Sequence, residues 1–271
     1  MPKEALNSLV HKLLHASASI PLGRQHLYHV RRALKAENRL GGARAVLGRA
    51  AIAELRWQRA QLLAEEPIGV PFATRRLFPA PGGAGVLTPY SDASKEEENP
   101  TESGYGAWCV IDGTFAYVEG RWTEAECQAL SINALELAAM NIGTFSFLEY
   151  AARRGLRVEY VHEFVDNEAA EFVADRGKPR APVMEDLLRD RYVAFWERGI
   201  FTAASRIASV DNDIADGLSR GGEKLEDALR IAAHSGMPIV KLEPPPKWRD
   251  LSAVVRAAPW SGQRRRGPPQ P

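Results

Sequence analysis

The chain has 271 residues, of which 45% are hydrophobic and 25% are charged, and its formal net charge is +1. This composition is ordinary for a globular protein of one large or two modest domains. A net charge this close to zero gives no support for nucleic-acid binding by the overall charge of the protein. Two cysteines, Cys109 and Cys127, exclude a disulfide framework. No apolar run approaches the ~18 residues of a membrane span. We therefore expect a soluble intracellular protein, cytoplasmic or nuclear, with no membrane partner.

The first part of the chain predicts a small helical module. Apolar residues recur at helical spacing over 4–36, with a break at Ile20–Gly23, and 43–65 gives a third helical run. Prolines and a Gly-Gly pair mark 66–85 as a linker. We predict a first domain over 1–78. Residues 1–80 hold 13 Lys and Arg against 5 Asp and Glu, which fits either a polyanion-binding surface or an ordinary solvated helical face.

Strand patterns begin at residue 86. Residues 86–93 predict one strand, and the apolar runs 104–111 and 114–118 flank Asp112-Gly113, a strong hairpin signal. Three consecutive strands that can pair antiparallel follow from this pattern. Pro89 conflicts with a central strand because it cannot donate a ladder hydrogen bond. We expect the strand to begin after Pro89 or to contain a bulge there.

Helices and strands then alternate along the chain. Residues 123–150 predict a helix that opens with a capping box, Thr123 and Glu126, and Gly143 kinks or ends it. The later elements are expected at 157–166 (strand), 168–175 and 183–198 (helices), 201–207 (strand), 210–219 and 223–234 (helices). This order predicts an α/β fold with a mixed five-stranded sheet flanked by helices, over 86–221. Residues 222–271 then supply one helix and a basic, Pro-rich tail.

Four acids fall at suitable places in this pattern. Asp92 and Asp166 end strands, Glu136 lies in the long helix, and Asp216 lies in the last helix of the domain. Each alone fits a turn, a cap or a solvated surface. Together, strand ends and a helix packed across them can gather all four. Clustered carboxylates repel one another, and divalent cations relieve that repulsion; oxygen ligands favour magnesium or manganese over zinc. Two such ions ~4 Å apart suit phosphodiester hydrolysis.

Four short segments resemble the ribonuclease H domain of retrotransposon polyproteins. They occur in the family's order: Ser91-Asp92-Ala93-Ser94, Leu135-Glu136-Leu137-Ala138-Ala139, Val165-Asp166-Asn167, and Asn212 to Arg220 with its Ala-Asp-x-Leu-Ser-Arg ending. The resemblance covers about 86–221. It implies a ribonuclease H-like fold and a metal-dependent endoribonuclease that cleaves the RNA strand of RNA–DNA hybrids. It also implies two Mg²⁺ or Mn²⁺ ions as cofactors.

The resemblance assigns a role to each acid. Asp92 would bridge both ions, Glu136 would bind one of them and orient the scissile region, and Asp166 would bind the ion on the nucleophile side. Asp216 would complete the other ion's site. Further residues are expected to contact the nucleic acid: Ser94, Asn167, Arg206, Asn212, Arg24 and Arg31.

The N-terminal module has a looser resemblance. The segment Leu13 to Arg24, with the Arg-rich helix after it, is similar to the segment that follows the polymerase palm in tyrosine-recombinase (DIRS-like) elements. There it would belong to the thumb or connection, which grips the template–primer duplex. The polymerase motif Tyr-x-Asp-Asp occurs nowhere in the chain. The polymerase part of the same polyprotein is therefore expected as a second partner.

Two departures from the family pattern support an alternative. Arg206 stands where many cellular members have a loop histidine, six residues before Asn212, and residues 96–102 form an acidic insert beside Asp92. Both features, together with Pro89 in the expected central strand, favour a catalytically silent ribonuclease H-like module that binds nucleic acid or serves a structural role.

Overall fold

A computed structural model of the chain describes residues 2–16, 27, 29–34, 46–63, 85–99, 102–177 and 181–257. The chain forms two compact units. One comprises Met1–Phe78 with Tyr192–Trp196, and the other comprises Pro79–Arg191 with Glu197–Pro271. The domain limits given above stay predictions, since 64–84 lies outside the described residues. No helix in the described ranges is long and apolar enough to cross a membrane.

The first unit is helical where it is described. It contains α1 (Lys3–Ala16), a helix over 29–34, and α3 (Arg49–Leu62). Their apolar faces share one core, made of Leu6, Val10, Val30, Leu34 and Ala51. Glu54 of α3 is buried and accepts a hydrogen bond from the backbone nitrogen of Val30 at 3.0 Å. A carboxylate near the start of the 29–34 helix satisfies a donor that the helix itself leaves unpaired.

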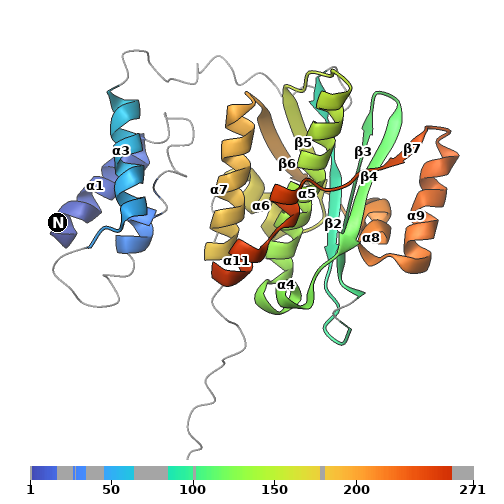
Figure 1. Cartoon of the computed structure of the whole chain (residues 1–271), viewed down its shortest axis with the longest axis horizontal. Helices are drawn as coiled ribbons and strands as arrows, with labels where there is room; N and C mark the ends of the chain where they lie inside the picture. Colours follow the sequence, from blue (N-terminus) through green and yellow to red (C-terminus); the bar gives the residue numbers. More distant parts are fainter. Residues whose placement is uncertain are drawn as a thin grey trace, which may run out of the picture. The chain divides into compact units, whose positions relative to one another are not determined.

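The second unit is built on a mixed sheet (Figure 1). Its strands are β1 (Val86–Leu87), β2 (Tyr90–Ser94), β3 (Gly104–Ile111), β4 (Thr114–Arg121), β5 (Tyr160–Val165), β6 (Phe201–Arg206) and β7 (Ile239–Lys241). β2, β3 and β4 pair antiparallel, whereas β5 runs parallel to β1, β2 and β6, and β7 runs parallel to β4. The predicted mixed sheet flanked by helices is confirmed.

Within the described residues the sheet has seven strands rather than the predicted five, and Pro89 accounts for one of the two extra strands. β1 and β2 follow one another along β5, because Val86 pairs with Tyr160 and Tyr90 pairs with Phe164. The chain is interrupted between them at Thr88-Pro89, where the Pro89 carbonyl still accepts the Phe164 N–H at 2.8 Å. Proline has no N–H to donate but keeps its carbonyl as an acceptor, so the strand is interrupted at Pro89 while the bond to Phe164 is retained.

The hairpin predicted at Asp112-Gly113 is confirmed. Both turn residues have positive φ, 49° at Asp112 and 71° at Gly113. Positive φ at both central residues is the geometry that Asp-Gly favours and that suits the twist of paired strands.

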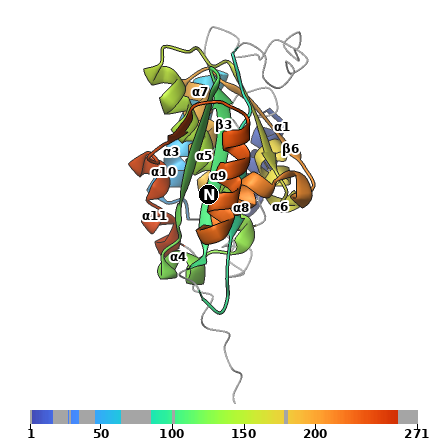
Figure 2. The same cartoon turned by 90° about the vertical axis from the view of Figure 1, so that its right-hand side faces the viewer.

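Helices cover both faces of the sheet. They are α4 (Glu124–Ala129), α5 (Ile132–Arg153), α6 (Glu168–Arg176), α7 (Pro182–Glu197), α8 (Asp213–Arg220) and α9 (Gly222–His234). A Cβ on Gly143 of α5 would lie 2.4 Å from that of Ala107, and one on Gly106 would lie 2.4 Å from that of Leu218 in α8. Adjacent residues of a strand point to opposite faces, so α5 and α8 lie on opposite sides. Figure 2 shows α8 and α9 in front of the strands.

The predicted helix over 123–150 is two helices. Its capping box at Thr123 and Glu126 is confirmed and starts α4. A second cap follows at Ser131, whose hydroxyl accepts from the Ala134 N–H and starts α5. α5 then continues through Gly143, which neither kinks nor ends it. The absence of a side chain there lets α5 approach β3 closely.

The C-terminal part holds more structure than one helix and a tail. We call residues 239–257 the C-terminal strap; it contains β7, α10 (Pro246–Arg249) and α11 (Ser252–Ala257), and it crosses in front of α5 in Figure 1. Trp248 stacks on Phe145 with ring centroids 3.8 Å apart. Arg249 donates to Glu126 at 2.7 Å. The strap is therefore an integral layer of the second unit.

Candidate metal centre

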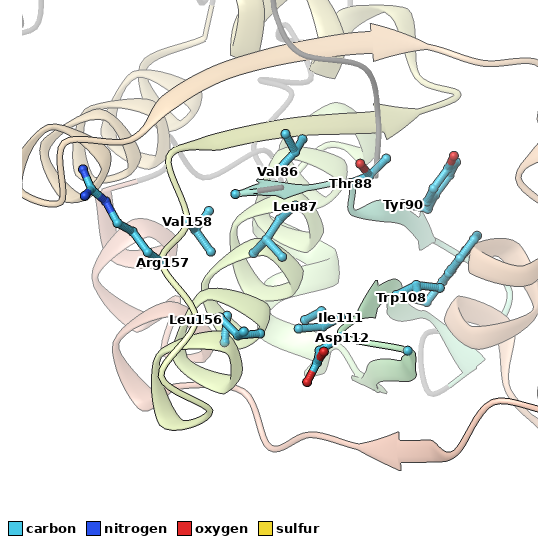
Figure 3. Close-up of a pocket in the computed structure, with 14 residues that line it drawn as sticks. Val86, Leu87, Thr88, Tyr90, Trp108, Ile111, Asp112, Leu156, Arg157 and Val158 are labelled. Atoms are coloured by element: carbon cyan, nitrogen blue, oxygen red, sulfur yellow. The ribbon is translucent and has the colours of Figure 1, made fainter. Parts of the chain in front are cut away.

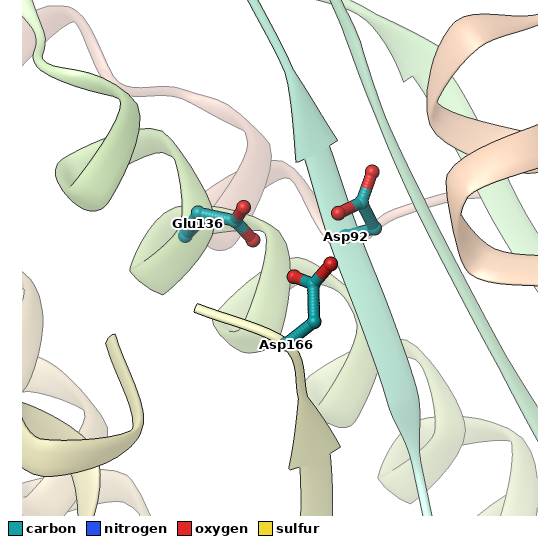
Figure 4. Close-up of side chains that lie close together, drawn as sticks. All are labelled: Asp92, Glu136 and Asp166. Carbon is teal, nitrogen blue, oxygen red and sulfur yellow. The ribbon is translucent and has the colours of Figure 1, made fainter. Parts of the chain in front are cut away.

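Three of the predicted acids meet at one edge of the sheet. β2 and β5 are parallel neighbours, so Asp92, which lies in the middle of β2 rather than at its end, is close to Asp166, which directly follows β5. α5 begins at the same end and brings Glu136 within its first turns. One carboxylate oxygen from each residue lies within 4.8 Å of those from the other two. Figure 4 shows the three side chains pointing toward one another.

Two acids of this cluster, Asp92 and Glu136, have raised pKa values. Asp92 is 6% exposed and Glu136 is 4% exposed. Burial, reinforced by Asp166 and Asp216, raises the pKa of Asp92 to about 6, although a hydrogen bond from Ser219 and the charge of Arg220 oppose the rise. Burial, reinforced by Asp92 and Asp166, also raises the pKa of Glu136. Both shifts mean that the negative charge lacks sufficient compensation from the chain.

The residues fit a hard divalent cation. The Oε2 atom of Glu136 is buried and has no hydrogen-bond partner among the described residues. An unpaired buried carboxylate oxygen is costly unless a cation or donor satisfies it. The donor set consists of carboxylate oxygens alone, with no cysteine or histidine in the group. This set suits magnesium or manganese better than zinc.

Asp216 lies beside the cluster but outside this group of three. It is on α8, and its carboxylate is held by Arg220 Nε at 2.6 Å and Lys224 Nζ at 3.5 Å. Arg220 also contacts Glu96 at 3.2 Å, at the start of the acidic insert. The charge of Asp216 raises the pKa values of both Asp92 and Glu136. Asp216 therefore acts on the cluster electrostatically while its own oxygens are engaged by cations.

Serine and asparagine side chains fix α8 against β2. Ser219 donates to Asp92 Oδ2 at 2.5 Å, and Ser94 donates to the Ser219 carbonyl at 2.9 Å. The Asn212 amide donates to the Ser91 carbonyl at 3.1 Å. Ser94 and Asn212, predicted to contact nucleic acid, are both buried and bonded within the fold. Their contact with nucleic acid stays a prediction.

The other predicted nucleic-acid contacts lie at different places. Asn167 caps α6 by accepting from the N–H groups of Ala169 and Ala170, each at 3.0 Å. Arg206, at the end of β6, is exposed and donates to the Asp166 carbonyl at 3.2 Å. Arg31 lies in the 29–34 helix of the first unit, and Arg24 lies outside the described residues. Within the second unit, Asn167 and Arg206 adjoin the cluster, since Asn167 follows Asp166 and Arg206 bonds to its carbonyl.

A second buried polar group was not predicted. Glu163 of β5 forms an ion pair with Arg191 of α7, and both side chains are 1% exposed. Thr144 donates to Glu163 Oε1 at 2.5 Å, and Arg191 donates to Asn141 at 3.2 Å. The sequence offered one signal, an acid at an inward-facing position of an apolar strand. Nothing in the pattern of α7 marked Arg191 as its partner.

A pocket opens where β1 separates from β3 (Figure 3). Its volume is about 580 Å³, and its walls include Leu87, Trp108 and Leu156. The acid on its rim, Asp112, is paired with Arg154 at 2.7 Å. The pocket thus lacks the convergent, uncompensated charges that distinguish the three-acid cluster.

Comparisons with known proteins were informative only for structures. Neither protein-family models nor curated proteins gave a match. Among solved structures, ribonuclease H1 from Halobacterium salinarum is 18% identical, covering 53% of this chain and 99% of that one, with a TM-score of 0.38. LC11 ribonuclease H1, solved with an RNA/DNA hybrid, is 17% identical over 53% and 99%, with a TM-score of 0.41. A foamy viral protease–reverse transcriptase is 12% identical over 68% and 27%, with a TM-score of 0.29.

Proposed function

We propose that the chain is a metal-dependent endoribonuclease that cleaves the RNA strand of RNA–DNA hybrids. One observation carries the proposal: Asp92, Glu136 and Asp166 converge within 4.8 Å, and burial raises the pKa of the first two. Three converging carboxylates without a basic partner inside the group are poorly suited to a purely structural role. The order of the motifs supports ribonuclease H in particular.

The chain's own residues would hold the ions and keep them in place. Asp92, Glu136 and Asp166 would ligate through carboxylate oxygens, with Asp216 as the fourth acid. Bound there, two Mg²⁺ or Mn²⁺ ions would activate a water and stabilise the leaving oxygen of a phosphodiester. The parallel strands β2 and β5 fix two of the acids, and α5 fixes the third. Such preorganised ligands need little rearrangement during the reaction.

The substrate and the wider context are further parts of the proposal. Recognition of RNA would use the 2′-hydroxyl, and contacts to the backbone would be independent of sequence. Asn167 and Arg206 adjoin the cluster and are suitable for such contacts. The Ala-Asp-x-Leu-Ser-Arg ending supports an origin in a retroelement polyprotein, with the basic first unit as a thumb or connection. The polymerase part would then act in trans.

A catalytically silent ribonuclease H-like module is the second candidate. The position of Asp216 favours it, since Arg220 and Lys224 hold both oxygens of that carboxylate. A centre whose fourth acid stays paired would bind cations weakly and cleave slowly. Such a protein would still bind hybrids through contacts to the phosphate backbone of the nucleic acid.

Labelled substrates distinguish these candidates. The full chain is incubated with an RNA–DNA hybrid, duplex RNA or duplex DNA, in Mg²⁺, Mn²⁺ or a chelator. We expect cleavage of the RNA strand of the hybrid alone, dependent on the metal and lost in Asp92→Asn and Asp166→Asn. A folded wild type that binds the hybrid without cutting it in either metal would select the silent module. Cutting that both variants retain would contradict the assigned centre.

A further inference from the structure

The last turn of α8 lies in unusually close contact with β2 and β3. A Cβ on Gly104 would lie 2.4 Å from the Ser219 carbonyl oxygen, and one on Gly106 would lie 2.5 Å from the Ser219 nitrogen. Only residues without side chains allow the helix backbone this approach. The approach carries the Ser219 side chain to Asp92, on the strand next to β3.

The hydroxyl of Ser219 is fully buried and faces one acid of the centre. Its exposed fraction is 0%, and it lies 2.5 Å from Asp92 Oδ2 and 2.9 Å from the Asp216 carbonyl oxygen. A serine hydroxyl has one proton to donate, and a carboxylate is a stronger acceptor than a carbonyl. The proton therefore goes to Asp92, at the distance typical of a charge-assisted bond.

The Ser219 backbone is itself held from two sides. Its carbonyl oxygen accepts from Ser94 Oγ at 2.9 Å and from Arg121 Nη1 at 3.2 Å. The donor to Asp92 is thus tied to β2, which carries that acid, and to β4. A side chain fixed in this way can fix the rotamer of the carboxylate that it bonds.

We propose that Ser219 is a positioning residue for the metal centre: its hydroxyl holds one oxygen of Asp92 and so leaves the other aimed at Glu136 and Asp166. The inference rests on the proposed function, since it concerns the same carboxylates. Hydrogen bonds to ligating carboxylates orient them, and removal of such a partner costs about 10–100-fold in metal affinity or activity. Ser219 also belongs to the helix of Asp216, so one helix sets two of the four acids.

The test uses the full chain and Mn²⁺ as the probe, with binding measured by titration calorimetry. Ser219→Ala removes the donor, and Ser219→Cys keeps nearly the same volume with a weak donor. We expect both variants to bind Mn²⁺ about tenfold more weakly than wild type. Their kcat on the hybrid should fall by a similar factor with KM unchanged. Ser219→Thr, which retains the hydroxyl, should recover most of the binding.

Ser146→Ala is the matched control. Ser146 is also a buried helical serine, but it donates to the Ile142 carbonyl within α5 at 2.7 Å and contacts no acid of the centre. This control should bind Mn²⁺ as wild type does. Melting temperatures of all variants separate loss of positioning from loss of fold. If Ser219→Ala does not fold, Ser219→Cys carries the comparison.

The outcomes separate this inference from the nuclease proposal. Folded Ser219→Ala and Ser219→Cys that bind Mn²⁺ like wild type would overturn the positioning role. Weaker Mn²⁺ binding in both, with no cleavage by wild type, would sustain the positioning role while the nuclease proposal fails. A wild type that binds no Mn²⁺ would overturn both.

Discussion

α5 and β5 contribute to two groups of buried acids that are compensated in opposite ways. Toward the middle of the sheet, Glu163 of β5 meets Arg191, with Thr144 and Asn141 of α5 completing the hydrogen bonds. Near the carboxyl end of β5, Glu136 of α5 and Asp166, which directly follows β5, meet Asp92 of β2, and the group of three contains no basic residue. The Glu163 group has its charge balanced by Arg191 of the same chain, and we call it the closed group. The group of Asp92, Glu136 and Asp166 contains no positive charge, and we call it the open group.

The comparison teaches that charge balance, rather than acidity, distinguishes a structural group from a functional one. A buried acid paired with a buried arginine and bonded by a threonine hydroxyl is satisfied by the fold alone. Buried acids that raise one another's pKa destabilise the fold until something outside the chain supplies charge. Four changes break or sharpen this contrast.

The largest effect is expected from Arg191→Met. Methionine is apolar and similar in length to arginine, so the change preserves packing but leaves Glu163 buried without its cation. Breaking a buried pair from one side costs roughly 3–5 kcal/mol, which approaches the total stability of a domain. Urea unfolding should show this loss. The double change Glu163→Met with Arg191→Met should recover most of it, and a double variant as unstable as the single one would contradict the explanation.

Asp92→Asn should act in the opposite direction when no divalent cation is present. The rise in the pKa of Asp92 from 3.8 to about 6 corresponds to roughly 3 kcal/mol at neutral pH. Removing that charge should therefore stabilise the fold while abolishing cleavage. Thermal unfolding in a chelator at pH 7.5 measures the difference. A destabilised Asp92→Asn would show that the cluster is compensated like Glu163.

The pH dependence of that difference is a separate prediction. A carboxyl group whose pKa is raised by folding penalises the fold only once it ionises. The penalty is small below pH 3.8 and complete above about pH 6. The stability advantage of Asp92→Asn over wild type should grow by about 1 kcal/mol per pH unit from pH 4 to pH 6, then level off. A difference independent of pH would exclude a titrating Asp92 as its source.

The smallest effect is expected from magnesium itself. Mg²⁺ at about 100 times its dissociation constant should stabilise wild type by roughly 2.7 kcal/mol. Thr144→Val, which weakens the closed group, should respond to Mg²⁺ as wild type does. Asp166→Asn, which weakens the open group, should not respond. Melting temperatures with and without Mg²⁺ test both, and an equal response in all three proteins would place the ion elsewhere.

The sequence predicted most elements of the sheet because they leave local signals, and three of the four predicted acids lie close together in the structure. The Asp112-Gly113 turn and the Thr123 capping box each depend on neighbouring residues. The Pro89 interruption was foreseen for the same reason. The seven-stranded sheet was not, because β7 has only three residues and is stabilised by β4, far away in sequence.

The parts of the site that were missed depend on contacts between distant segments. Ser219 lay in a recognised motif, but its bond to Asp92 joins residues 127 positions apart. The pairing of Asp216 with Lys224 requires the turn between α8 and α9. Arg191 meets Glu163 only in the folded chain, since the two residues are 28 positions apart. Spacing along the chain contains no information on such approaches.

The C-terminal strap also has a consequence for the order of synthesis. β4 ends at Arg121, and its parallel neighbour β7 begins at Ile239, about 120 residues later. At roughly 5–20 residues per second, an emerging chain would present β4 with an open edge for roughly 6–24 s. Such edges invite pairing with other chains. We expect chains that stop before the strap to aggregate, because the strap supplies the strand that covers this edge of β4.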